Sequence, residues 1–313
     1  MICTRGTKKI DEQMAEAAIV SAFLLQTEGE NMKSKILIVD GSNLLFQMFF
    51  GMPARIYNEQ GVGIWGVIGF VGALLKIIRQ TNPTHLAVLF DGESENERTL
   101  IDGDYKANRV DYSQVTEEEN PFSQLPYIYQ ALEWMGISYA ETTDCETDDW
   151  IASYVKLYGE EHEMVISSFD SDFFQLISEN VSILRYRGDN SILCTPEYLW
   201  EKFEIWPSRY AEFKSLTGDK ADNIPGAPKV GTKTASALLK EFGTLENLIR
   251  NAETIKKLSV KVSIMENSER LLRNLQLIKL EGNVPVPFEL EEMQFADNGI
   301  TTTEVLRAIG LKS

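Results

Sequence analysis

The chain has 313 residues, of which 43% are hydrophobic and 25% charged, so it is long enough for two domains with a sizeable core. Its net charge of −17 excludes a general polyanion-binding surface and confines any nucleic-acid contact to a local basic patch. The two histidines are too few for a histidine-rich zinc site, and no apolar run reaches the roughly 20 residues of a membrane span. Three widely spaced cysteines indicate a reducing compartment, and we expect a cytoplasmic protein without membrane contact.

The first 33 residues predict an extension or one added helix. Basic residues precede the apolar run 17–25, as in a signal peptide, but Asp11 and Glu12 interrupt the basic region and no small-residue cleavage site follows. We therefore separate residues 1–33 from the folded part of the chain.

The folded part begins with alternating strands and helices. The aliphatic run Ile36–Val39 predicts a strand that is buried on both faces, and a helix over 63–79 follows. Further strands are predicted over His85–Phe90 and Met164–Ser168. This alternation indicates a parallel sheet covered by helices, with a ligand site at the carboxyl ends of its strands. Three strands end in an aspartate at that edge: Asp40, Asp91 and Asp170.

A further group of acids lies in the segment ETDDWIASY. Its apolar residues fall at helical spacing, so Glu146, Asp148 and Asp149 occupy the first turn of a helix. Favourable interaction with the helix N-terminus, worth a few tenths of a kcal/mol each, would account for one or two of them. It does not account for Asp170 and Asp172 at the same sheet edge, where unpaired carboxylates repel one another. Oxygen-only clusters of this kind suit Mg²⁺ or Mn²⁺, and two such ions serve in-line phosphoryl displacement.

The C-terminal third carries the basic residues. Thr195 caps a predicted helix in TPEYLWEKF, and two helical segments then flank a glycine hairpin in TGDKADNIPGAPKVGTKTA. Glycines allow a phosphate to approach closely, and the helix that starts near Thr232 offers its N–H groups. Between Lys214 and Lys279 there are twelve Lys and Arg against seven Asp and Glu. This concentration of positive charge favours contact with a duplex backbone.

These motifs resemble those of the 5′-nuclease family, which includes the 5′→3′ exonuclease domain of bacterial DNA polymerase I, phage 5′-nucleases and flap endonucleases. ILIVDGSNLLF and VLFDG are similar to its first two acidic motifs, ETDD to its Glu-Ala-Asp-Asp motif, and FDSDFFQL to its Asp-Lys-Asp-Leu-x-Gln-Leu motif. The glycine hairpin resembles the family's helix-three-turn-helix segment, and RTLIDGDYKANR its gateway segment. The likeness extends in order from Ile36 to Leu280.

The resemblance implies an α/β fold: a PIN-like (Rossmann-like), mostly parallel sheet flanked by helices, followed by a helical helix-three-turn-helix domain. We expect an N-terminal extension over 1–33, a metal-dependent catalytic domain over 34–205 and a DNA-binding domain with a C-terminal tail over 206–313. Because the sequence ends at Ser313 without a polymerase or proofreading domain, we expect a free-standing, monomeric nuclease.

The resemblance also implies roles for individual residues. The first metal ion would be held by Asp40, Asp91, Glu146 and Asp148. The second would be held by Asp148, Asp170, Asp172 and Asp219, with Asp149 and Asp222 acting through water. In the gateway segment, Lys106 and Arg109 would steady the phosphate, Tyr105 would stack on a base, and Arg98 would add charge. The duplex backbone, together with a K⁺ ion, would lie at the hairpin residues Gly226, Lys229, Val230, Gly231, Lys233 and Thr234.

The implied function is a structure-specific, Mg²⁺-dependent 5′→3′ exonuclease or flap endonuclease that uses two ions, with Mn²⁺ as a substitute. Its partners would be DNA with 5′ ends, flaps or single-strand/duplex junctions, and its products a 5′-phosphate and a 3′-hydroxyl. Two positions depart from the family, since Ser171 replaces a usual Lys and Gln47 a usual Arg.

Several alternatives have aspartates at strand ends as well. A haloacid-type phosphatase needs a second Asp where Ser42 stands, and a response-regulator receiver has about half this length. A non-catalytic, structure-specific DNA-binding protein and a PIN-type ribonuclease remain as alternative functions.

Overall fold

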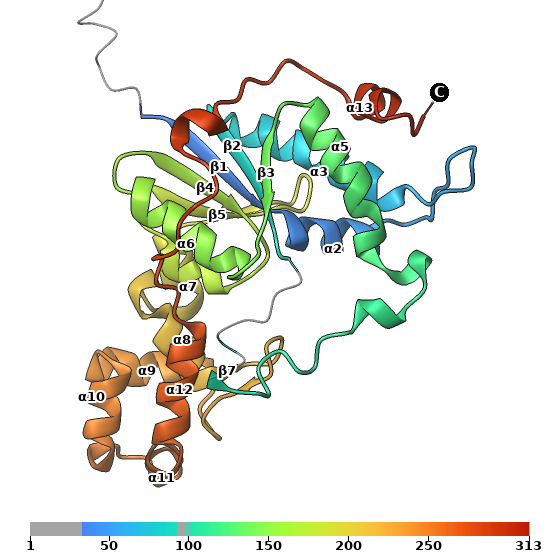
Figure 1. The fold of residues 1–313 in the computed structure, drawn as a ribbon. Coiled ribbons are helices and arrows are strands. Elements are labelled where there is room, and N and C mark those ends of the chain that lie inside the picture. The colour runs from blue at the N-terminus through green and yellow to red at the C-terminus, as the bar shows by residue number, and fades with distance from the viewer. Residues whose placement is uncertain (1–32, 93–97, 99–100, 313) are drawn as a thin grey trace, which may run out of the picture. The chain divides into compact units, whose positions relative to one another are not determined.

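The computed structural model describes residues 33–92, 98 and 101–312, so the predicted N-terminal extension lies outside the described residues except for residue 33. From Lys35 onward the chain forms one compact unit around a six-stranded sheet in the order β3-β2-β1-β4-β5-β6 (Figure 1). The first five strands in the chain are parallel, and β6 is an antiparallel edge strand. Their bounds are β1 Lys35–Asp40, β2 His85–Phe90, β3 Ser138–Glu141, β4 Glu163–Ser167, β5 Val181–Arg185 and β6 Ile192–Cys194.

Helices cover both faces of this sheet, as Figure 1 shows. Leu37 and Val39 of β1 pack with α2 (Gly41–Gly51), α3 (Trp65–Thr81) and α5 (Leu125–Trp134), whereas Ile36 and Ile38 pack on the opposite face, where α6 (Thr147–Tyr158) lies. Adjacent residues of a strand point to opposite faces, so an unbroken aliphatic run can fill both cores. The predicted mostly parallel sheet flanked by helices is therefore confirmed.

A helical region follows the sheet. It consists of α7 (Pro196–Phe203), α8 (Tyr210–Thr217), α9 (Thr232–Phe242), α10 (Leu245–Arg250), α11 (Leu258–Glu266) and α12 (Ser268–Ile278). A two-stranded ribbon of β7 (Gly218–Asp219) and β8 (Ile224–Pro225) interrupts it between α8 and α9. Short 3-10 turns lie at Tyr112–Gln114, Glu117–Glu119, Pro121–Gln124, Asp172–Leu176, Pro207–Arg209, Ala252–Thr254 and Leu290–Met293. As predicted, Thr195 caps α7: its Oγ1 accepts the N–H of Tyr198 at 3.4 Å.

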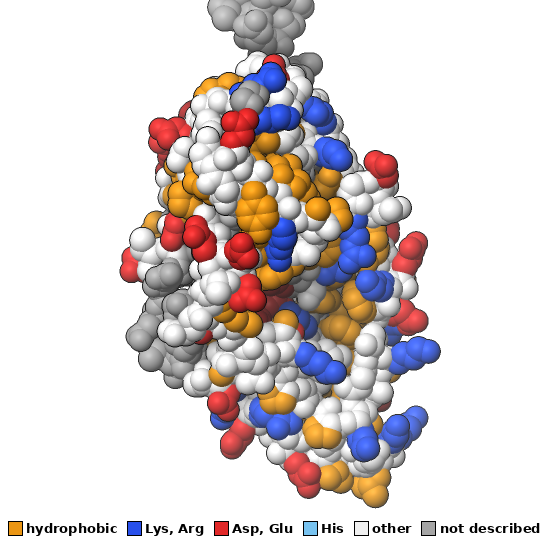
Figure 2. Space-filling model, turned by 90° about the vertical axis from the view of Figure 1, so that its right-hand side faces the viewer, with side chains coloured by type: hydrophobic (Ala, Val, Ile, Leu, Met, Phe, Trp, Pro, Cys, Tyr) orange, Lys and Arg blue, Asp and Glu red, His pale blue; other side chains and the backbone are white. Residues whose placement is uncertain are grey.

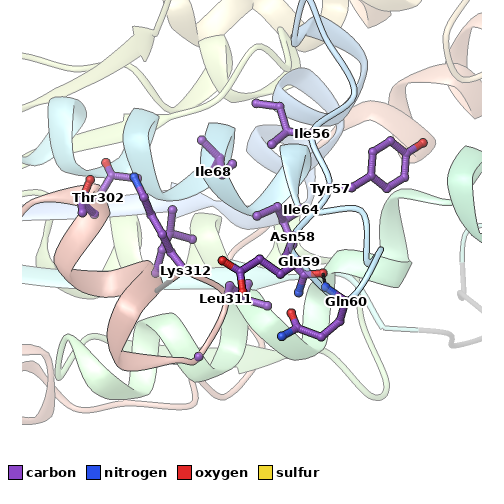
Figure 3. A pocket seen from close by; sticks show the side chains of 13 residues that line it. Ile56, Tyr57, Asn58, Glu59, Gln60, Ile64, Ile68, Thr302, Leu311 and Lys312 are labelled. Atoms are coloured by element: carbon purple, nitrogen blue, oxygen red, sulfur yellow. Dashed lines mark hydrogen bonds between the residues drawn. The ribbon is translucent and has the colours of Figure 1, made fainter.

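The C-terminal segment, residues 280–312, returns to the sheet and is called the strap below. Gln294 forms a bridge with His85, and the N–H of Phe295 donates to the carbonyl of Thr84 at 2.9 Å. The strap ends in α13 (Thr302–Ala308), whose buried Val305 and Leu306 join the core beneath α3 and α5. A hollow of about 500 Å³ remains between α13 and the loop before α3, as Figure 3 shows. None of the described helices is both long and apolar enough to cross a membrane.

Candidate metal centre and nucleic-acid interface

Four aspartates line one cleft at the carboxyl edge of the sheet. Asp40 ends β1, Asp91 follows β2, Asp170 follows β4, and Asp148 lies in the first turn of α6. The cleft has a volume of about 1000 Å³, and all four side chains line it. We call them the cleft carboxylates. Parallel strands bring their carboxyl ends to one edge, so residues more than 100 positions apart meet there.

The cleft carboxylates lie in an environment that disfavours their charged forms. Burial raises the pKa of Asp40 to about 7, and the charge of Asp91 adds to the shift. The pKa of Asp148 lies well above its ordinary value, first because of burial and then because of Asp170. Among the described residues, none of the four forms an ion pair with Lys or Arg. The cleft therefore holds clustered negative charge that a divalent cation would stabilise.

Glu146 and Asp149 have cationic partners instead. Arg98 forms ion pairs with Glu146 and, at 2.7 Å, with Asp149, and Lys106 forms a second ion pair with Glu146. Burial works against ionisation of Glu146, but Lys106 and Arg98 outweigh it and lower its pKa. Glu146 and Asp149 also form the capping box of α6, so the capping role weighed from the sequence is real for these two residues.

The segment from residue 104 to 109 is tied to the ribbon β7–β8. The backbone N–H of Lys106 donates to the carbonyl of Asp222 at 3.1 Å, and Arg109 forms an ion pair with the Asp222 carboxylate at 2.9 Å. Tyr105 is buried, and its hydroxyl donates to Glu146 at 3.4 Å. In this arrangement its ring packs inside the protein, so stacking on a base would require the segment to move.

A second carboxylate cluster lies where the helical region meets the sheet. Asp172, Asp219 and Asp222 offer oxygens within 4.8 Å of one another, a spacing that allows them to share a metal ion. Lys214 of α8 lies among them and forms ion pairs with Asp172 and Asp219. Burial opposes the charge on Lys214, yet Asp172 and its neighbours raise its pKa above the ordinary value. The ammonium group is therefore a fixed positive charge of this cluster.

Sequence reasoning missed two groups of residues. From the sequence, Lys214 was counted only as one of twelve basic residues. Its position among the apolar residues of α8 nevertheless indicates a buried lysine, and a buried lysine needs acidic partners. Three aromatic side chains that line the cleft, Phe46, Tyr112 and Phe122, meet edge to face with ring centroids 5.3–5.6 Å apart. Their signal was weak because Phe46 lies on a helix and the other two lie in short 3-10 turns far along the chain.

The two departures from the family have local partners. Gln47 donates from Nε2 to the carbonyl of Tyr186 at 2.8 Å. For Ser171, the backbone carbonyl accepts the N–H of Phe174 at 3.0 Å. A guanidinium group nevertheless lies close to Asp170. Arg185 donates to the carbonyl of Phe169, the residue directly before Asp170, at 2.7 Å.

The glycine hairpin precedes α9. Gly226 packs against the backbone, and a Cβ there would lie 2.4 Å from the carbonyl carbon of Thr217; Val230 is also buried. Lys229, Gly231 and Lys233 are exposed, while Thr234 is half-buried in the first turn of α9. Figure 2 shows Lys and Arg side chains scattered over the lower part of the molecule, which Figure 1 identifies as α9–α12. The exposed members of the hairpin can thus contact a phosphate chain.

Comparisons with known proteins agree with this architecture. Residues 35–204 match the family described as "5'-3' exonuclease, N-terminal resolvase-like domain", and residues 205–299 match "5'-3' exonuclease, C-terminal SAM fold". The chain is 33% identical to the thermostable DNA polymerase I of Thermus thermophilus over 261 residues, which are 83% of this chain and 30% of the polymerase. It is 32% identical to DNA polymerase I of Streptococcus pneumoniae over 270 residues, 84% of this chain and 30% of that protein. The chain thus spans about a third of the length of these relatives.

Solved structures share the fold. The 5′-exonuclease of bacteriophage T5 with bound zinc ions has a TM-score of 0.65 at 24% identity, covering 78% of this chain and 89% of that one. The catalytic core of Rad2 in complex with a DNA substrate has a TM-score of 0.54 at 16% identity, covering 83% and 84%. The two family matches together account for the sheet, its acidic edge and most of the helical region, and the chain belongs to the 5′–3′ exonuclease family.

Proposed function

We propose that the chain is a structure-specific 5′-nuclease that hydrolyses DNA phosphodiester bonds as a 5′→3′ exonuclease and flap endonuclease. The observation that carries the proposal is the cleft in which the cleft carboxylates lie beside Lys106 and Arg109. One site thereby combines carboxylates that can bind a divalent ion with two basic side chains that can bind a phosphate. The DNA complex of the Rad2 core supports DNA as the partner. The form of this DNA would be one with 5′ ends, flaps or single-strand/duplex junctions.

The residues of the centre fit divalent metal ions. All donors are carboxylate oxygens, which suit Mg²⁺ and allow Mn²⁺ to substitute, and burial already disfavours their unneutralised charge. One ion would be held by Asp40, Asp91, Glu146 and Asp148. The other would be held by Asp148, Asp170, Asp172 and Asp219, with Asp149 and Asp222 bonded through water. Bound ions would supply water activation and neutralisation of the leaving oxygen, giving a 5′-phosphate and a 3′-hydroxyl.

The remaining side chains would bind and orient the substrate. Lys106 and Arg109 line the cleft and would donate to phosphate oxygens as negative charge builds up on them. Arg98 would act as a positioning residue, because it holds both Glu146 and Asp149. The edge-to-face cluster of Phe46, Tyr112 and Phe122 offers an apolar wall against which a nucleobase can stack.

The hairpin would bind the duplex away from the cleft. Lys229 and Lys233 would contact phosphates, helped by the free N–H groups at the start of α9 and by a K⁺ ion at the hairpin carbonyls. Gly226 and Val230 would hold the hairpin in shape. We divide the chain functionally into a catalytic domain over 34–205 and a DNA-binding domain over 206–313. We propose a monomer in the cytoplasm.

The test is a 5′-end-labelled flap duplex incubated with the protein in Mg²⁺ and in EDTA, beside a single-stranded RNA of the same sequence. Cleavage of the flap duplex in Mg²⁺ alone supports the proposal. Binding without cleavage in either condition would make the chain a DNA-binding protein. Cleavage of the RNA alone would make it a ribonuclease.

A further inference from the structure

Lys214 occupies the space between two carboxylates that are proposed metal ligands. It lies on α8, and its side chain is only 7% exposed. Its ammonium group forms ion pairs with Asp172 and Asp219, and an oxygen of Asp222 lies within 4.8 Å of an oxygen of each of these two. We call Asp172, Asp219 and Asp222 the lysine-paired cluster.

The position of Lys214 is fixed by packing. Its neighbours Phe213 and Leu216 are buried in the main core, and Tyr210 packs one turn earlier on the same helix. A short helix anchored at three points keeps the lysine stem inside the protein. The ammonium group can therefore leave the lysine-paired cluster only by a change of its own side-chain rotamers.

A lysine ammonium and a divalent ion compete for the same oxygens. Mg²⁺ binds carboxylate oxygens at about 2.0–2.1 Å, close enough that an ammonium group bonded to the same oxygens would be in contact with the ion. The two positive charges would repel each other strongly in a site this shielded from water. The cleft carboxylates differ, since among the described residues none of them pairs with Lys or Arg.

We propose that Lys214 is the resident counter-cation of the second metal site, and that a second divalent ion binds only by displacing its ammonium group from Asp172 and Asp219. This inference rests on the proposed function, because it takes Asp172 and Asp219 as metal ligands. It makes the two sites unequal. Among the described residues of the first site only Glu146 pairs with cations, and Asp40, Asp91 and Asp148 are open to the ion, whereas at the second site Lys214 pairs with both Asp172 and Asp219. The first ion should therefore bind tightly and the second weakly.

The experiment is an equilibrium titration with Mn²⁺, in which free ion is measured by electron paramagnetic resonance without DNA. We compare the wild type, Lys214→Met and the matched control Lys220→Met, which removes the same charge from an exposed residue beside Asp219. The wild type and the control should show one tight and one weak site. Lys214→Met should tighten the weak site at least about tenfold, the effect of one lost charge–charge repulsion. An unchanged or weaker second site in Lys214→Met would overturn the proposal.

A second measurement on the wild type guards against misfolding of the variant. Reductive methylation followed by peptide mass spectrometry reports how accessible each lysine is. Lys214 should be protected without metal and become modified at Mn²⁺ concentrations that fill the second site, whereas exposed Lys220 should be modified in both conditions. Protection of Lys214 that persists with the second site filled would refute displacement. Neither readout depends on cleavage. Failure of the flap assay would therefore overturn the nuclease proposal, whereas the displacement of Lys214 is decided by the Mn²⁺ titration and the methylation experiment.

Discussion

The cleft carboxylates and the lysine-paired cluster belong to one acidic centre but differ in how their charge is balanced. Asp40 and Asp148 have raised pKa values caused by burial and by neighbouring acids. Burial also disfavours ionisation of Asp219, but Lys214 overcomes it and lowers the pKa of that carboxyl. Asp172 differs from Asp219, because burial raises its pKa to about 7 although Lys214 acts against the shift. Lys214 thus offsets part of the unfavourable charge in the lysine-paired cluster, whereas the cleft carboxylates have no Lys or Arg partner among the described residues. The comparison predicts opposite responses to the same kind of substitution.

The largest effect is expected from Asp148→Asn. Asp148 lies between the two proposed ion positions, so its loss should reduce cleavage by at least about 10³-fold. Duplex affinity should stay close to wild type because the hairpin binds separately. Single-turnover assays at saturating Mg²⁺ and fluorescence anisotropy measure the two properties. Near-normal turnover would contradict the assignment of Asp148.

Next come the two cations of the cleft. Lys106→Ala and Arg109→Ala should each slow the single-turnover step by about 30- to 1000-fold, the equivalent of 2–4 kcal/mol, with a smaller change in DNA affinity. Lys76 on α3, an exposed residue outside the cleft lining, supplies the control Lys76→Ala. If affinity falls and the saturated rate holds, the segment only binds DNA.

Stability without metal should separate the two halves by sign. Asp170→Asn removes one of several repelling charges and should raise the melting temperature. Asp172→Asn removes one of two partners of buried Lys214 and should lower the melting temperature. Breaking a buried ion pair costs about 3–5 kcal/mol when no other partner remains, and the cost should be smaller here because Asp219 still pairs with Lys214. Differential scanning calorimetry in EDTA measures both. If both substitutions shift the melting temperature in the same direction, the charge of the cleft carboxylates and that of the lysine-paired cluster are balanced in the same way.

Substitutions in the hairpin should not alter the metal-free stability of either carboxylate group and should change DNA affinity instead. Lys229→Ala or Lys233→Ala should weaken duplex binding and reduce the log–log salt slope by up to about one unit per lost phosphate contact. Anisotropy titrations at several salt concentrations measure the slope. Equal slopes for wild type and variants would show that these lysines do not contact phosphates.

The smallest effect concerns pH. The pKa of Asp40 is raised to about 7 in the folded protein, so the folded state binds more protons than the unfolded chain between about pH 4 and pH 7. Metal-free stability should therefore fall as the pH rises through this window, by a few degrees in melting temperature. Asp40→Asn retains an amide oxygen that can cap α2 and should flatten the dependence. A melting temperature that rises over the same window would contradict the raised pKa.

The sequence predicted the part of the centre that depends on strand order. Aliphatic runs ending in Asp40 and Asp91 reveal both the strands and the edge at which they meet, because parallel pairing follows from alternation with helices. Lys214 could not be assigned in this way, since its partners come from the 3-10 turn at Asp172 and from the ribbon β7–β8. The pairing of Arg98 with Glu146 likewise joins residues 48 positions apart that strand order does not bring together. Family resemblance supplied the roles of Asp172 and Asp219, and it gave no indication of their shared lysine partner.

The strap has a consequence for the order in which the protein is made. Arg79 of α3 donates to the carbonyl of Ile300 at 2.6 Å, and Thr84 accepts the N–H of Phe295. These contacts of the sheet region can form only after residues more than 200 positions later have been synthesised. A ribosome adds roughly 5–20 residues per second, so the core surface that Val305 and Leu306 cover stays open for about ten seconds or more after β2 has emerged. The catalytic region is thus completed late in translation, after the hairpin region has already left the ribosome.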